Sequence, residues 1–213
     1  MTERQNIINE LLVDKIIKRI ASIENDYQKA QGIILTEDDL KCLIFHFLYE
    51  MPELKHDTPL YDEGTNGSPL HSEITFFDMD GKLHLKPDIT IINPYNYSIL
   101  HSIEGVHVNK ENKLVYKATS SKEYEFGGKC IVIELKFYKG KKGITTFKGI
   151  ENDIDKIKKL QDIAHKNTQQ KTWGIMVVFN KTDIESREFK LFRDGYANNP
   201  DIKFVYCTGK VIF

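Results

Sequence analysis

The chain has few of the residues that mark disulfide-stapled or zinc-binding proteins. Only three of its 213 residues are cysteines (Cys42, Cys130 and Cys207), and they are widely spaced with no CxxC pair. This pattern argues against a disulfide framework or a cysteine zinc site, and a reducing, cytoplasmic compartment is expected. Cys42 and Cys130 lie in apolar runs, so we expect both to be buried as small hydrophobic residues.

An excess of charge of one sign and long apolar runs are also lacking. The formal net charge is -1, so the chain as a whole is not a basic nucleic-acid binder, although a local basic face is compatible with this value. No apolar run approaches the length that spans a bilayer, and neither a signal peptide nor a membrane partner is expected. A hydrophobic content of 40% and a charged content of 29% are instead typical of a globular protein with one sizeable core.

Apolar periodicity predicts an α/β protein in which helices and strands are interleaved. The first helix has two interpretations, because its apolar face could pack on the sheet or form a dimer arm. The predicted elements, in order, are a helix over residues 5–29, a helix from Thr36 (with a Thr36–Asp39 capping box) that stops before Pro52, a β-hairpin of Ser72–Phe77 and Leu83–Ile92 turning at Asp78–Gly81, extra strands at Tyr97–Ile103 and Lys113–Ala118, a strand at Cys130–Tyr138, a helix from Thr146 to Lys166, a strand at Trp173–Asn180, a helix at Asp183–Tyr196, and strands at Ile202–Cys207 and Val211–Phe213.

Two of these strands carry charged residues where burial is expected. Pro87-Asp88 precedes the apolar run Ile89–Ile92, and Glu134-Leu135-Lys136 lies inside Cys130–Tyr138. Because strand side chains alternate between faces, Glu134 and Lys136 share a face, roughly 6–7 Å apart along the strand. Charge on a buried strand requires a partner or a chemical task. If the two strands are neighbours, Asp88 and Glu134 can bind one hard divalent cation beside Lys136.

These residues resemble the PD-(D/E)xK motif of the restriction-endonuclease-like nuclease superfamily. The resemblance implies a mixed β-sheet flanked by helices, in a single nuclease-like domain over residues 1–213. Within it, residues 1–35 form an N-terminal helix, residues 36–180 the core, residues 93–129 an inserted β decoration, and residues 181–213 a C-terminal helix and strands. The interval between Asp88 and Glu134 is longer than in compact members, which the insertion explains.

The resemblance also implies roles for the site residues. Asp88, Glu134 and the main-chain carbonyl of Leu135 would bind Mg²⁺ or Mn²⁺. Lys136 would orient or deprotonate the attacking water, or offset phosphate charge. Without a metal role, Asp88 would be a structural cap and Glu134–Lys136 a cross-strand ion pair.

An upstream acidic residue often completes such a site. Glu73, expected on the strand before Asp88, is the first choice, with Glu37 and Glu50 as rivals at the two ends of the second helix. His46 in the same helix is a weaker candidate ligand, and as a lone histidine on an apolar helix it is more typical of a packing residue.

Two further features lie near the motif. Asn152–Ile157 is similar to an Asp-Ile-x-Lys-Leu pattern of small bacterial members of the superfamily, in which the helix packs beside the site; it could equally be a solvated helix face. The lysines Lys139, Lys141, Lys142 and Lys148 either neutralise phosphates or only solubilise a turn.

The sequence therefore predicts a metal-dependent endonuclease that acts on DNA, in restriction, phage defence or repair. The alternatives are a non-catalytic nucleic-acid-binding or assembly module with the same fold, and an RNA-cleaving enzyme. Tyr95, Tyr97 and Tyr116 are too scattered to indicate base stacking. Double-strand cleavage usually requires a homodimer, of which the first helix is only a weak hint.

Overall fold

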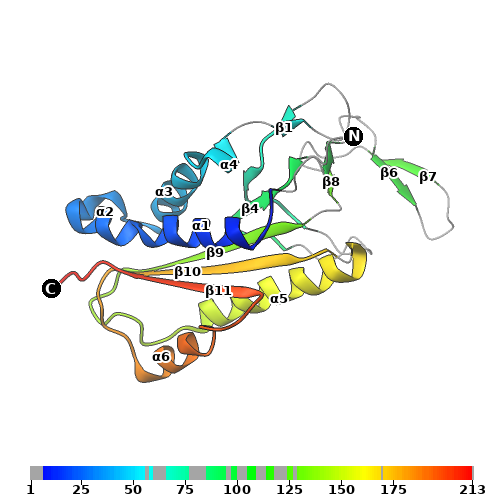
Figure 1. Cartoon of the computed structure of the whole chain (residues 1–213). Helices are drawn as coiled ribbons and strands as arrows, with labels where there is room; N and C mark the ends of the chain where they lie inside the picture. The colour runs from blue at the N-terminus through cyan, green and yellow to red at the C-terminus, as the bar shows by residue number, and fades with distance from the viewer. Residues whose placement is uncertain are drawn as a thin grey trace.

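A five-stranded mixed sheet forms the centre of the structure (Figure 1). The computed structural model describes residues 7–55, 58–59, 66–76, 85–94, 97–99, 105–108, 114–117, 124–126, 129–168 and 170–212. The sheet contains, in chain order and in spatial order, β3 (Leu70–Ser72), β4 (Ile89–Ile92), β9 (Cys130–Tyr138), β10 (Thr172–Asn180) and β11 (Ile202–Thr208). β4 is antiparallel to both of its neighbours, β3 and β9, whereas β9, β10 and β11 run parallel.

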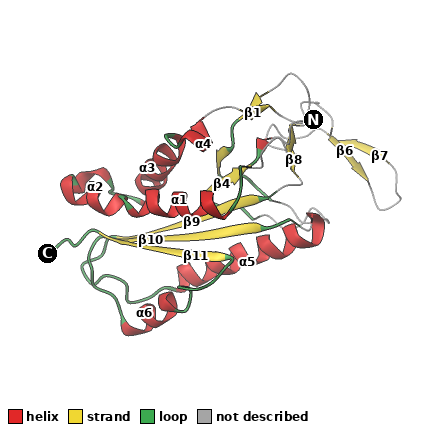
Figure 2. Ribbon diagram, viewed as in Figure 1, coloured by secondary structure: helices red, strands yellow, loops and turns green. Residues whose placement is uncertain are grey.

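Helices cover both faces of this sheet, giving three layers (Figure 2). One side carries α1 (Glu10–Ala21) and α3 (Glu37–Tyr49), and the other carries α5 (Lys148–Thr168) and α6 (Arg187–Asp194). The chain is thus an α/β protein with an open mixed sheet and flanking helices. The remaining described elements are α2 (Ile23–Lys29), η1 (Gln31–Ile33), α4 (Pro52–Lys55), β1 (Thr58–Pro59), β2 (Asn66–Gly67), β5 (Tyr97–Ile99), β6 (Gly105–Val108), β7 (Leu114–Lys117) and β8 (Tyr124–Phe126).

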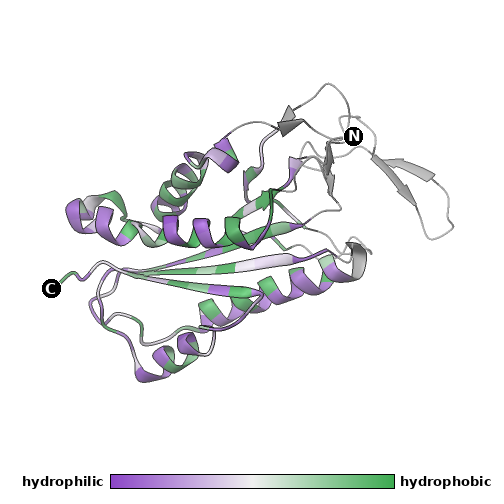
Figure 3. Ribbon diagram, viewed as in Figure 1, coloured by the Kyte–Doolittle hydropathy of each residue, from purple (hydrophilic) through white to green (hydrophobic). Residues whose placement is uncertain are grey.

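The strands divide the interior into two apolar cores, because successive side chains of a strand point to opposite faces. In β9, Ile131, Ile133 and Leu135 pack in the core with α1 and α3, whereas Cys130 and Val132 pack with α5 and α6. Figure 3 shows apolar colour along the sheet and on the helix sides that meet it. The same alternation places Glu134 and Lys136 on the α5 face of the sheet.

The N-terminal helices are set by local hydrogen bonds. The predicted capping box of α3 is confirmed, with Asp39 N–H donating to Thr36 Oγ1 at 3.1 Å and Thr36 N–H to Asp39 Oδ2 at 2.9 Å. The prediction of one helix over residues 5–29 is wrong. α1 ends at Ala21 and α2 begins at Ile23, because the Ser22 hydroxyl donates to the Arg19 carbonyl at 2.7 Å and interrupts the helix between them.

The predicted hairpin before and after Asp88 is confirmed only in part: its first strand, expected at Ser72–Phe77, lies instead at Leu70–Ser72, and its second is shorter than predicted. β3 pairs antiparallel with β4, and an isolated bridge joins Phe76 and Leu85. The predicted turn Asp78–Gly81 lies outside the described residues. The described strands between β4 and β9 form two separate two-stranded sheets, β5–β8 and β6–β7; much of residues 93–129, including parts of the predicted strands Tyr97–Ile103 and Lys113–Ala118, lies outside the described residues.

Two predictions made from apolar runs are wrong. Val211–Phe213 was expected as a strand, but residues 209–212 are not in one, and Phe213 is outside the described residues; Val211 N–H donates instead to the Lys181 carbonyl. Cys42 is exposed rather than buried, because the buried side of α3 is formed by Leu40, Ile44, Phe47 and Leu48. Across the described residues, no helix is both long enough and apolar enough to cross a membrane.

Close packing of α5 against β10 depends on Gly174. A Cβ atom at this position would lie 2.3 Å from Ile157 Cγ2. We therefore expect Gly174→Ala to lower the free energy of unfolding by about 1–3 kcal/mol, because the helix must move away from the sheet. Chemical denaturation measures this loss. Gly140→Ala is the matched control, since a Cβ there meets no atom within 4 Å; equal loss in both variants would contradict the packing argument.

Candidate active site

The sheet register brings Asp88 and Glu134 to neighbouring positions. Ile89 of β4 pairs with Ile133 of β9 in an antiparallel register. Asp88, which precedes Ile89, therefore lies beside Glu134, which follows Ile133. Asp88 Oδ2 accepts a hydrogen bond from Leu135 N–H at 2.9 Å, which fixes its carboxylate against β9. Burial raises the pKa of Asp88, although that hydrogen bond and the positive charges of Lys156 and Lys136 act against burial. The carboxylates of Asp88 and Glu134 therefore lie together, partly shielded from solvent.

Glu134 is the most deeply buried charged residue of this site, with only 1% of its surface exposed. Lys156 of α5 lies 2.7 Å from Glu134 Oε2, while Oε1 has no hydrogen-bond partner among the described protein atoms. Burial raises the pKa of Glu134 to about 8, outweighing the lowering effect of Lys156. A buried oxygen without a partner is costly in a structural ion pair but suits a carboxylate whose ligand is a cation.

Lys136 reaches the same face as Glu134 and lies between two other carboxylates. Its Nζ is 3.0 Å from Asp153 Oδ2 on α5 and 3.3 Å from Glu37 Oε1 at the start of α3. Burial would lower the pKa of Lys136, but Asp153 and Glu37 together outweigh burial and hold this pKa above its usual value. Lys136 is therefore a fixed positive charge at neutral pH in this arrangement.

The candidate upstream acids lie in different surroundings. Glu37, a rival in the sequence analysis, reaches the site, since it also accepts from Phe137 N–H at 3.1 Å. Glu73 does not lie on a strand as predicted: β3 ends at Ser72, and Glu73 has a left-handed φ of 56°. The described ion pairs of Glu73 are with Lys41 and Lys86. His46 is exposed on α3, and Glu50 is exposed at the C-terminal cap of that helix.

Asp153 and Lys156 of α5 contact the residues of this site. The sequence allowed two interpretations of Asn152–Ile157, a helix beside the site or a solvated helix face, and these contacts favour the first. Lys156 Nζ also donates to the Lys86 carbonyl at 3.3 Å and lies 3.6 Å from Asp153 Oδ1. The apolar residues of α5 face the sheet, which leaves these two residues at the border of the buried stripe beside β9. The signal that could have identified them is the need of a buried Glu134 for a positive partner.

The donor set fits a hard divalent cation only in part. Asp88 and Glu134 offer oxygen ligands, and the unpartnered Glu134 Oε1 leaves a coordination position free. Within the described residues, however, no group of three or more histidine, cysteine, aspartate or glutamate side chains is arranged to hold a metal. Any ion here would keep several waters or take further oxygens from the main chain and the substrate, as Mg²⁺ commonly does.

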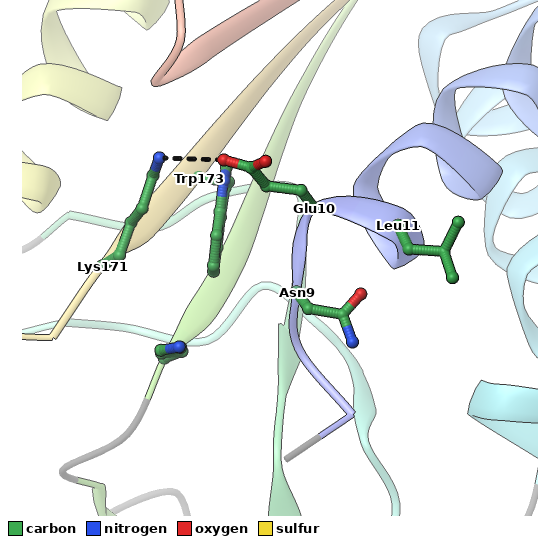
Figure 4. Close-up of a pocket in the computed structure, with 6 residues that line it drawn as sticks. Asn9, Glu10, Leu11, Lys171 and Trp173 are labelled. Atoms are coloured by element: carbon green, nitrogen blue, oxygen red, sulfur yellow. Dashed lines mark ion pairs between the residues drawn. The ribbon is translucent and has the colours of Figure 1, made fainter. Parts of the chain in front are cut away.

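Other features of the surface lie apart from these carboxylates. An open hollow of about 530 Å³ is lined by Asn9, Glu10, Leu11, Lys129, Lys171 and Trp173 (Figure 4). Trp173 pairs with Ile131, three residues before Glu134, and packs in the core on the α1 side, so the hollow opens away from the site. The four lysines that the sequence suggested could neutralise phosphates are exposed after the end of β9; they are Lys139, Lys141, Lys142 and Lys148.

Comparisons with known protein families, with curated proteins and with solved structures found no match. The function must therefore be argued from the chemistry of the site itself.

Proposed function

We propose that the chain is a metal-dependent endonuclease of the PD-(D/E)xK, restriction-endonuclease-like type, which hydrolyses phosphodiester bonds in DNA. The observation that carries the proposal is Glu134: a carboxylate buried in the central strand, beside Asp88, with one oxygen that has no protein partner among the described residues. An unsatisfied buried oxygen is costly in a purely structural Glu–Lys pair, whereas a bound cation would satisfy it. Support also comes from the order of the elements, in which an antiparallel hairpin leads to β9 and α5 leads to the parallel strand β10.

Asp88 and Glu134 would hold Mg²⁺ or Mn²⁺, with the Leu135 carbonyl as a further ligand. A divalent ion in such a site polarises the scissile phosphate and makes a bound water more acidic. The backbone keeps the two carboxylates close, because Asp88 is tied to the Leu135 N–H. Burial keeps bulk water from competing for them.

Lys136 would act as a cation rather than as a base. Its raised pKa means that it carries its proton at neutral pH, so it cannot readily accept another from water. Its ammonium group is instead suited to offset the negative charge that develops on the phosphate in the transition state. Asp153 and Glu37 would fix the position of this ammonium group.

Metal binding tests the proposal most directly. We expect calorimetry to detect Mn²⁺ binding to the intact chain, and Asp88→Asn and Glu134→Gln each to weaken it at least about tenfold, because each removes a charged ligand. Asp162→Asn, at an exposed position of α5, is the matched control and should bind as the intact chain does. Equal affinity in all variants would refute the assignment of these two carboxylates.

A cleavage assay separates the proposal from its alternatives. An endonuclease cuts DNA in Mg²⁺ or Mn²⁺ and stops when EDTA is added. A non-catalytic binding module on the same fold would bind nucleic acid without cutting it. An RNA-cleaving enzyme would prefer substrates that carry the 2′-hydroxyl group.

A further inference from the structure

Glu73 is clamped between two lysines that come from different elements. Lys41 of α3 lies 2.7 Å from Glu73 Oε1, and Lys86, before β4, lies 2.5 Å from Glu73 Oε2. The hydrogen bonds from Lys41 and Lys86, in that order, lower the pKa of Glu73 to about 2. Two ammonium groups thus converge on a single carboxylate, each holding one of its oxygens.

This cluster, Lys41–Glu73–Lys86, adjoins the candidate active site. Glu73 N–H donates to the Asp88 carbonyl at 3.1 Å, and the carbonyl of Lys86 accepts from Lys156, the partner of Glu134. The left-handed φ of Glu73 is uncommon for a residue with a side chain, and such conformations persist where their surroundings hold them. The backbone therefore presents the Glu73 carboxylate to the two lysines right beside Asp88.

We propose that Lys41 and Lys86 bind a DNA backbone phosphate that flanks the scissile phosphate. Glu73 occupies this phosphate site until DNA displaces it. This inference rests on the proposed nuclease function. A carboxylate and a phosphodiester both present a pair of anionic oxygens, so two ammonium groups arranged for one also suit the other. The side chains of Lys86, Glu73 and Lys41 are 50%, 43% and 19% exposed, so a strand can reach Lys86 and Glu73 from solvent, and Lys41 is the least accessible of the three.

The structural alternative is that the cluster only ties α3 to the hairpin of β3 and β4. The two roles predict opposite effects of Glu73→Gln. A tie loses stability when its carboxylate is removed and gains no affinity for DNA. An internal competitor, once removed, leaves Lys86 and Lys41, the second of which still pairs with Asp38 at 3.3 Å, available to phosphate, so binding becomes tighter.

The experiment measures the affinity for a DNA duplex in EDTA, by fluorescence anisotropy over a range of salt concentrations. We expect Glu73→Gln to bind about three- to tenfold more tightly, because DNA no longer has to displace the Glu73 carboxylate from the two lysines. Lys41→Gln and Lys86→Gln should each bind more weakly, and the double variant should lower the salt slope by about one, because the two lysines share one phosphate. Glu53→Gln is the matched control, because Glu53 also pairs with a lysine, Lys15, but outside the site; it corrects for the change in net charge.

Binding by Glu73→Gln that is equal to or weaker than that of Glu53→Gln would overturn the inference, as would undetectable DNA binding by every variant. Mn²⁺ calorimetry on Glu73→Gln is the second readout. Unchanged metal affinity is expected, whereas a loss would restore Glu73 as a metal ligand and overturn its role as a competitor. Because the DNA titration needs neither metal nor cleavage, a chain that binds DNA as inferred but fails the metal and cleavage assays would refute the nuclease proposal alone, whereas tight metal binding and cleavage with no gain in Glu73→Gln would refute this inference alone.

Discussion

Replacing Lys136 with methionine should lower the rate of DNA cleavage by about 10²- to 10³-fold while leaving metal binding nearly intact. Methionine keeps much of the side-chain length and removes the charge that would stabilise the transition state. Lys136 is not expected to ligate the metal, and its loss removes a positive charge that would repel a cation. Single-turnover cleavage rates at saturating Mg²⁺ measure the first effect, and Mn²⁺ calorimetry measures the second.

Lys158→Met on α5 is the matched control for this experiment. Lys158 is half exposed and pairs with Asp155 on the solvent side of the helix, so its loss removes an equal charge outside the site. A cleavage rate in Lys136→Met within threefold of that of Lys158→Met would contradict the role given to Lys136. Circular dichroism should show that both variants remain folded, because Glu37 keeps its bond to Phe137 N–H and Asp153 keeps Lys156 nearby.

Lys156→Met should produce the largest loss of stability, because it leaves Glu134 buried without a positive partner. We expect the free energy of unfolding to fall by about 3 kcal/mol in alkaline buffer. Under these conditions Glu134 is either a buried charge without a partner or must bind a proton that is scarce. The loss should shrink in mildly acidic buffer, where a neutral carboxyl group is tolerated. Urea denaturation across this range measures both values.

The pH dependence follows from the direction of the Glu134 shift. Burial raises its pKa from 4.5 to about 8, so the folded protein binds this proton more tightly than the unfolded chain does. The stabilisation from this proton is complete below pH 4.5 and is lost as the pH rises through 8. Glu134→Gln should lack this part of the pH dependence, and Lys156→Met should extend it to higher pH because a lowering influence on the pKa is gone.

Two controls make the result specific to this pair. Lys158→Met should change stability by no more than about 0.5 kcal/mol, as expected for an exposed position. The double variant Lys156→Met with Glu134→Gln should recover most of the loss, because no charge is then left unpaired. A loss in Lys156→Met that does not vary with pH would show that Glu134 is not the cause.

The parts of the fold that the sequence predicted are those set by local pattern. The strand Cys130–Tyr138 has the predicted bounds, because its apolar run is continuous and is buried on both faces for most of its length. The capping box at Thr36 is also set locally, because its hydrogen bonds join residues only three apart, and it is confirmed. Errors came where a tertiary contact or a single side chain decided the outcome, as at Ser22 and at Glu73.

The site was predictable only where strand pairing defines it. The alternation of β9 was enough to expect Glu134 and Lys136 on one face, and Asp88 was expected beside Glu134 if the two strands were neighbours; the pairing of β4 with β9 meets that condition. The contacts of Glu37, Asp153 and Lys156 depend on how α3 and α5 pack on the sheet, which no spacing in the sequence specifies. The metal, the substrate and the catalytic roles stay predictions until the experiments above are done.

The agreement between the spatial order of the five sheet strands and their order along the chain has a consequence for biosynthesis. A chain emerging from the ribosome can add each strand to the one already made, from β3 to β11. Asp88 and Glu134 are both present once β9 has emerged, but Lys156 follows only with α5. A nascent chain that ends before α5 would thus hold two crowded acids with no lysine from that helix, and Glu134 would gain its ion-pair partner only when α5 docks on the sheet.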